Sequence, residues 1–248
     1  MNLKPIFRYR LANNLRGVGV FFGIMALIMA AAIIGFTSVY MRIGNNVSGS
    51  FSAYGFASAV ALFVFGITAI REDVRLALQN GTSRLTVFSA EVLSLVATAV
   101  ILAAAGEALT ALGQALTKSY DNLRIVDIFQ LLFWQSSTES GMTFLQHAGS
   151  AACMTAMFIC ADLAGMFLSL IFYRLNKGWT ITVAIAGPLL IFNGLPFLIY
   201  KFSGFFFPIG KFIVGSPQNF VLSMLLAAMI TGAFNWLLLR HAPVKAAK

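Results

Sequence analysis

Six apolar runs fill most of the chain, and they constrain its fold more than any motif does. Each is close to the length of about 20 residues that an α-helix needs to cross a bilayer. Of the whole sequence, 59% is hydrophobic and only 10% is charged, whereas a soluble domain has about 25% charged residues. The pattern predicts an all-α, multi-pass membrane protein with a single transmembrane domain over residues 1–248. The expected spans are residues 17–39, 51–70, 85–105, 150–172, 179–200 and 217–239.

The distribution of lysine and arginine predicts the orientation of these spans. One side, which includes both chain ends, holds twelve of the 17 basic residues, and the other side holds five. In membrane proteins the cytoplasmic connections carry the excess of positive charge. Both termini are therefore expected in the cytoplasm, in a protein of the cell membrane. The net charge of +9 then reflects topology, and no nucleic-acid partner is expected, because the basic residues do not form one patch interleaved with aromatic residues.

Three segments outside the spans predict structure of their own. Residues 4–16 form one apolar face at helical spacing, which predicts an interfacial amphipathic helix that either anchors the first span or contacts a partner. Residues 113–149 mix charged residues with an apolar piece and predict an external segment with a short helix on the membrane surface. Residues 201–216 are rich in Phe and Gly and predict a re-entrant or interfacial hairpin between spans five and six. Pro188 and Pro196 are expected to kink the fifth span.

A polar stretch, residues 71–84, separates the second and third apolar runs. It predicts a short cytoplasmic helix with one polar and one apolar face, of which the polar face comprises Arg71, Arg75 and Gln79. Asn80-Gly81 is a helix stop, because glycine tolerates the left-handed conformation, and Thr82 or Ser83 can cap the following helix. The result is either a rigid coupling element between two spans or a solvated loop whose charges fix the topology.

The sequence REDVRLALQNGTSRLTVF, which begins with this stretch, resembles the first cytoplasmic loop of bacterial permease subunits of type-2 ATP-binding-cassette (ABC) exporters. The amphipathic amino-terminal helix, the six spans and the late apolar hairpin extend the resemblance. It implies that the stretch is a coupling helix that docks on a separate cytoplasmic ABC ATPase, with two ATPase copies and two permease chains, as a homodimer or a heterodimer. ATP and Mg would be bound by that ATPase, in agreement with the absence of a G-x-x-x-x-G-K-[ST] loop from this sequence. The residues implied in ATPase coupling are Arg71, Glu72, Asp73, Arg75, Gln79, Asn80, Gly81 and Arg84.

Asp162 is the acidic residue that interrupts an expected span near its middle, about 18 Å from the end of the fourth span at 1.5 Å per residue. A carboxylate at that depth must be protonated, paired or exposed to a watery cavity. Asn193 and Asn235 are candidate partners at similar depth, together with Thr182 and Thr231. Asp162, Asn193 and Asn235 are thus candidates for a translocation path, and the alternative is a buried group that fixes helix packing.

Two other acidic residues flank the third expected span. Glu91 is expected to reach water or to pair with an arginine of residues 71–84, and Glu107 is expected at the external interface. Neither is predicted to carry a function.

Three function classes follow from these features. The first is the permease subunit of an ATP-driven exporter that moves an amphipathic peptide, lipid-like or drug-like substrate. The second is a proton-coupled secondary transporter that uses Asp162. The third is an intramembrane enzyme, which is disfavoured because His147 and His241 lie outside the spans on opposite sides and no metalloprotease motif is present. No catalytic residue, metal site or cofactor is therefore expected in this chain, and Cys153 and Cys160 are expected to be core residues.

Overall fold

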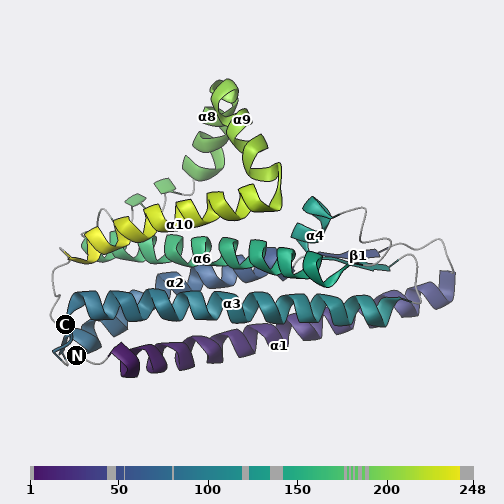
Figure 1. Ribbon diagram of the computed structural model, residues 1–248, viewed down its shortest axis with the longest axis horizontal. Helices are drawn as coiled ribbons and strands as arrows, with labels where there is room; N and C mark the ends of the chain where they lie inside the picture. Colours follow the sequence, from purple (N-terminus) through teal and green to yellow (C-terminus); the bar gives the residue numbers. More distant parts are fainter. Residues whose placement is uncertain are drawn as a thin grey trace.

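The computed structural model describes residues 3–43, 49–52, 54–79, 81–118, 123–134, 142–175, 178, 180, 182–183, 186–187 and 190–240. These residues form a long helical bundle (Figure 1). The all-α class is confirmed, with the addition of two three-residue strands. The principal helices are α1 (Leu3–Ile43), α2 (Tyr54–Gln79), α3 (Arg84–Thr117), α6 (Phe144–Arg174) and α10 (Pro217–Arg240).

Four of these helices are long and apolar enough to cross a membrane, in the part of the chain that the structure describes. They are α1 over Leu3–Val39, α3, α6 and α10, and they are compatible with a multi-pass membrane protein. Within α2, the described apolar part, Tyr54–Thr68, is shorter than a span. The expected fifth span, residues 179–200, lies partly outside the described residues, so the four helices support expected spans one, three, four and six.

The predicted boundary between an amphipathic amino-terminal helix and a first span is wrong. A single helix, α1, runs without a break from Leu3 to Ile43. The sequence offers no reason for a break, because the proline at position 5 falls in the first turn, where its missing N–H is tolerated. The helix that contains the third expected span, residues 85–105, is longer than that span, since α3 continues to Thr117 through residues that favour helix.

The two ends of the bundle differ in what they carry. We call the end where α1 and α3 begin and α10 finishes the proximal end, and the opposite end the distal end (Figure 1). Arg84 joins α3 to the end of α10 at the proximal end, because its Nη1 donates to the backbone oxygens of Leu239 and Arg240. The turn between α2 and α3 thus lies at the same end of the bundle as the start of α1 and the finish of α10.

The distal end carries a small irregular cap. Strand β1 (Gly49–Phe51) pairs in parallel with β2 (Leu123–Ile125), with Gly49 opposite Leu123. The short helix α4 (Ile128–Phe133) follows β2 and contacts α6 and α2. A short helix in this segment was predicted, and the outward side chains of Ile128, Leu131 and Leu132 remain exposed.

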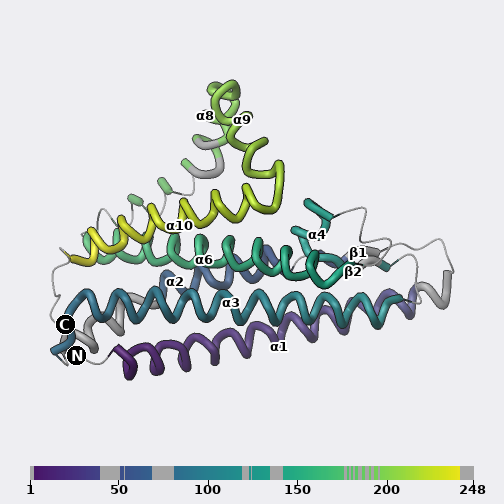
Figure 2. The backbone as a smooth tube through the Cα atoms, in the orientation of Figure 1, coloured from purple at the N-terminus to yellow at the C-terminus, as the bar shows by residue number. Residues whose placement is uncertain are grey.

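The segment between α6 and α10 stands apart from the bundle. It contains a π-helical turn, η1 (Leu190–Gly194), and then α8 (Leu195–Lys201) and α9 (Ser203–Val214). Figure 2 shows α8 and α9 as a hairpin that projects sideways beside α10. Most of the predicted hairpin, residues 201–216, is the single helix α9, and the hairpin of the structure consists of α8 and α9 with its turn between Lys201 and Ser203. No side chain of α9 is buried.

Small residues allow α2 and α6 to pack closely, as predicted for the face of α2 that carries Gly66. A Cβ atom at Gly66 would clash with the carbonyl oxygen of Asp162, and one at Gly165 would clash with the carbonyl oxygen of Phe63. Each glycine therefore faces the backbone of the other helix. This crossing holds Asp162 against α2 in the centre of the bundle.

Candidate functional site

The turn between α2 and α3 has the compact geometry that its sequence predicts. Helix α2 ends at Gln79, and Gly81 has a φ of 71°, a conformation that glycine adopts without strain. Ser83 is the N-cap of α3, and its Oγ accepts a hydrogen bond of 3.2 Å from the backbone N–H of Thr86. Asn80, the other half of the predicted stop, lies outside the described residues.

The predicted separate coupling helix is instead the last part of α2. Helix α2 continues from its apolar part through residue 71 to Gln79 without a break, because no glycine or proline interrupts residues 67–79. For Arg71, Glu72, Asp73, Arg75 and Gln79 the structure describes the helical backbone alone. Arg84 is engaged with the end of α10, as described above.

A buried ion pair joins α1 to α3 inside the bundle. Arg10 Nε lies 2.9 Å from Glu91 Oε2, and both side chains are 3% exposed. Glu91 is 2% exposed, so the expected contact with water is wrong. The alternative, a pair with an arginine of residues 71–84, lies outside the described side chains for Arg71 and Arg75. Arg10 reaches Glu91 because α1 continues as one helix beside α3 and carries Arg10 into the bundle.

Asp162 is fully buried where α2 crosses α6. Neither of its carboxylate oxygens has a hydrogen-bond partner among the described residues. It lies within electrostatic range of Glu91, so the interior contains two carboxyl groups and the guanidinium of Arg10. Burying an isolated carboxylate costs several kcal/mol or more, which makes a proton the simplest counter-charge for Asp162.

The other two candidates for a translocation path are not gathered around Asp162 by any hydrogen bond of the described residues. Asn235 is fully buried on α10, and its Nδ2 donates to the carbonyl oxygen of Leu163 over 2.9 Å. Asn193 has an exposed side chain in η1. Thr182 and Thr231 each donate to a carbonyl four residues earlier in their own segments, Gly178 and Ala227. Asn235 is therefore a packing contact between α10 and α6.

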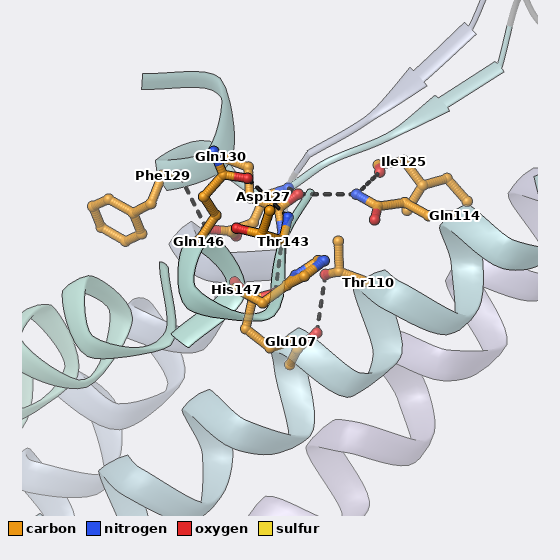
Figure 3. Close-up of polar contacts among 11 residues, drawn as sticks. Glu107, Thr110, Gln114, Ile125, Asp127, Phe129, Gln130, Thr143, Gln146 and His147 are labelled. Carbon is orange, nitrogen blue, oxygen red and sulfur yellow. Dashed lines mark hydrogen bonds and ion pairs between the residues drawn. The ribbon is translucent and has the colours of Figure 1, made fainter. Parts of the chain in front are cut away.

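A second polar cluster lies at the distal end, and the sequence did not predict it. Oε2 of Glu107 accepts a hydrogen bond of 2.9 Å from Gln130 Nε2 and lies 3.1 Å from Nδ1 of His147 (Figure 3). These side chains come from α3, α4 and α6. Glu107 is 7% exposed and Gln130 is fully buried, so Glu107, which was expected at the external interface, is covered by protein at the distal end. It became buried because α3 extends past it and the cap covers it.

The network continues from Gln130 into β2. Gln114 Nε2 donates to Gln130 Oε1 over 3.0 Å and to the carbonyl oxygen of Ile125 over 2.9 Å. The backbone N–H of Asp127 reaches the same Gln130 oxygen over 3.4 Å. One chain of hydrogen bonds thus ties α6, α3, α4 and β2 together.

Asp127 begins α4 and is itself buried. Its Oδ2 accepts a hydrogen bond of 3.0 Å from the backbone N–H of Phe129, and with Gln130 it forms a capping box. Burial raises the pKa of Asp127 to about 6, a rise that backbone N–H groups of α4 and Gly55 oppose and the nearby Glu107 carboxylate reinforces. The one local signal of this cluster in the sequence is the Asp-x-x-Gln capping pattern at 127–130.

The side chains of these clusters are carboxyl, amide, imidazole and guanidinium groups, whose chemistry is the binding and release of protons and the formation of hydrogen bonds. Among the described residues, no group of three or more His, Cys, Asp or Glu side chains could hold a metal ion. Comparison of the chain with protein-family models, with curated proteins and with solved structures finds no match.

Proposed function

We propose that this chain is the membrane permease subunit of an ATP-driven exporter of the type-2 ABC class. It would move an amphipathic peptide, lipid-like or drug-like substrate across the cell membrane, with a cytoplasmic ABC ATPase in two copies and a second permease chain. ATP and Mg would be bound by the ATPase. In this proposal the proximal end faces the cytoplasm, and residues 71–84 are the contact with the ATPase.

The observation that carries the proposal is the construction of the turn between α2 and α3. Gly81 and the Ser83 cap close it tightly, and it lies at the same end of the bundle as the end of α10. A compact turn between two long helices can pass a displacement from a soluble partner into the bundle, whereas a slack loop would absorb it.

The continuity of α2 supports the same function. Residues 71–79 and the apolar part of α2 belong to one helix, so a push at the turn moves the α2–α6 crossing as a unit. Arg84 adds a second connection, from the start of α3 to the end of α10. A displaced coupling segment would therefore act on two parts of the membrane bundle at once.

Co-purification tests the proposal. The tagged chain, isolated from its native membrane, should bring with it an ATPase that carries a phosphate-binding loop. The variants R75A and G81A should weaken that association and reduce substrate-stimulated ATP hydrolysis. G19A is a matched control, because a Cβ atom at either Gly19 or Gly81 would meet nothing within 4 Å, while Gly81 alone of the two has a positive φ. The proposal fails if no ATPase is retained, or if R75A and G81A both behave like G19A.

A proton-coupled secondary transporter is the second candidate, and one observation favours it. Asp162 is fully buried, and its two oxygens have no hydrogen-bond partner among the described residues. A carboxyl group in that position is suited to binding and releasing a proton during a transport cycle. In proteoliposomes without an ATPase, a pH gradient should then drive substrate flux, and D162N should abolish it. Flux that ignores the gradient would remove this candidate.

A further inference from the structure

The polar cluster at the distal end points to a role that is separate from ATP coupling. Its members come from three elements that meet at this end of the bundle, namely Glu107 and Gln114 of α3, Asp127 and Gln130 at the start of α4, and His147 of α6. We propose that Asp127, Glu107 and His147 form a proton-binding latch that holds the cap of β2 and α4 on the ends of α3 and α6 more tightly in mildly acidic solution.

The geometry makes Glu107 the centre of the latch. One of its oxygens, Oε2, receives both Gln130 Nε2 and His147 Nδ1, so this single atom joins the cap to α6. Its other oxygen, Oε1, is buried without a hydrogen-bond partner among the described residues. Of the two contacts that hold the carboxylate, the one with Gln130 comes from a neutral amide, and the one with His147 depends on which imidazole nitrogen carries a proton.

Protonation of the neighbours strengthens these contacts. A charged His147 donates from Nδ1 and adds an ionic attraction to Glu107. Protonation of Asp127 removes a negative charge that faces Glu107. Both changes act in the same direction as the pH falls.

The remaining titratable groups around Asp127 do not oppose this effect. Tyr54 of α2 and Cys153 of α6 lie within electrostatic range of it. Both are uncharged in their protonated forms, so neither supplies a positive charge that would hold Asp127 ionised. Among the described residues, His147 is the basic group that the cluster contacts.

The direction and size of the pH effect on cap opening follow from the difference between the pKa of Asp127 in the closed and the opened cap. Because the folded-state pKa of Asp127 is raised, from 3.8 to about 6, the closed cap binds the proton more tightly than an opened cap does. Stability of the closed state therefore increases as the pH falls through 6. With these two pKa values, the equilibrium constant for opening should be about tenfold smaller at pH 5.0 than at pH 7.5.

Hydrogen–deuterium exchange of the full-length protein in detergent measures this opening directly. Exchange of residues 123–134 is followed at pH 5.0 and 7.5 and corrected for the pH dependence of the intrinsic exchange rate. Residues 228–236 in the second half of α10, away from the contact of Phe220 with Phe129 of α4, serve as the internal reference. We expect the cap to gain about tenfold protection at pH 5.0 and the reference segment to stay unchanged.

Two substitutions of Asp127 distinguish the effect of its charge from its role as the N-cap residue of α4. D127N keeps a good N-cap residue for α4 but cannot ionise. In this variant, residues 123–134 should be as protected from exchange at pH 7.5 as they are in the unmodified protein at pH 5.0. D127A also loses the side-chain oxygen that accepts the hydrogen bond from the Phe129 N–H, so residues 123–134 should exchange faster at both pH values. The double variant D127N/H147Q should show no pH dependence.

Either of two results would overturn the latch. One is equal protection of residues 123–134 at the two pH values in the unmodified protein. The other is a double variant D127N/H147Q that retains the full pH dependence. Neither result bears on the ABC permease proposal, because the latch does not depend on it.

Discussion

Arg10 and Glu91 form an ion pair between α1 and α3 with an Nε–Oε2 distance of 2.9 Å, and both side chains are 3% exposed. The pair lies about 10 Å from the start of each helix at 1.5 Å per residue. It fixes the register of two helices that run in the same direction.

Removal of one member of this pair should be costly. R10A removes the Arg10 guanidinium from the buried Glu91 carboxylate, and breaking a buried pair costs about 3–5 kcal/mol. Thermal unfolding in detergent should show a large fall in midpoint for R10A and for E91A. R8A is the matched control, because Arg8 is an exposed arginine of the same helix, and its midpoint should stay near that of the unmodified protein. A midpoint for R10A equal to that of R8A would contradict the assignment.

The glycines at the α2–α6 crossing should not accept a methyl group. G66A and G165A each place a Cβ atom against a backbone carbonyl of the other helix, and such overpacking costs about 1–3 kcal/mol. Both variants should lower the unfolding midpoint, and G23A, where a Cβ atom meets nothing within 4 Å, should not. If G66A unfolds like G23A, the two helices are not in close contact at this point.

Asp162 and Asn235 should respond in opposite ways to substitution. N235A removes the hydrogen bond from Asn235 to the Leu163 carbonyl, and a hydrogen bond of this kind contributes about 0.5–1.5 kcal/mol. D162N removes the need to bury an ionisable carboxyl group, so its unfolding midpoint should equal or exceed that of the unmodified protein. Parallel thermal scans test this contrast, and a strong destabilisation by D162N would show that the carboxylate has a partner that matters for folding.

Gln130 should be essential to the cap. Its side chain donates to Glu107 and accepts from Gln114 and from the backbone N–H of Asp127, so Q130L removes three hydrogen bonds, each of which contributes about 1 kcal/mol. Proteolysis of the segment around α4 should accelerate in Q130L. The neighbouring L131Q variant changes an exposed side chain of the same helix and should leave proteolysis unchanged.

Local sequence signals were sufficient for several parts of this structure. The lengths of the apolar runs predicted α1, α3, α6 and α10, because an apolar run that crosses a membrane can satisfy its backbone in few structures other than a helix. Gly81 and Ser83 identified the turn between α2 and α3 because each residue type satisfies a specific backbone requirement. Gly66 indicated close packing because a missing side chain leaves room for another backbone.

The polar contacts could not be predicted in the same way. Arg10 was assigned to the membrane surface because the sequence was divided into an amphipathic segment and a span, whereas the continuous helix carries it inward to Glu91. Glu107, Gln130 and His147 lie in three separate elements, and no local pattern links them. Their contact depends on how far α3 extends and on where the cap folds back, which are properties of the tertiary structure.

The parallel pairing of β1 with β2 sets an order for the assembly of the chain. Gly49 follows α1, but its partner Leu123 emerges only after α2 and α3 have been synthesised. The covering residue His147 comes later still. A nascent chain that has inserted its first three helices therefore exposes an unpaired strand and an uncovered Glu107, and the distal end becomes complete only when α6 arrives beside α3.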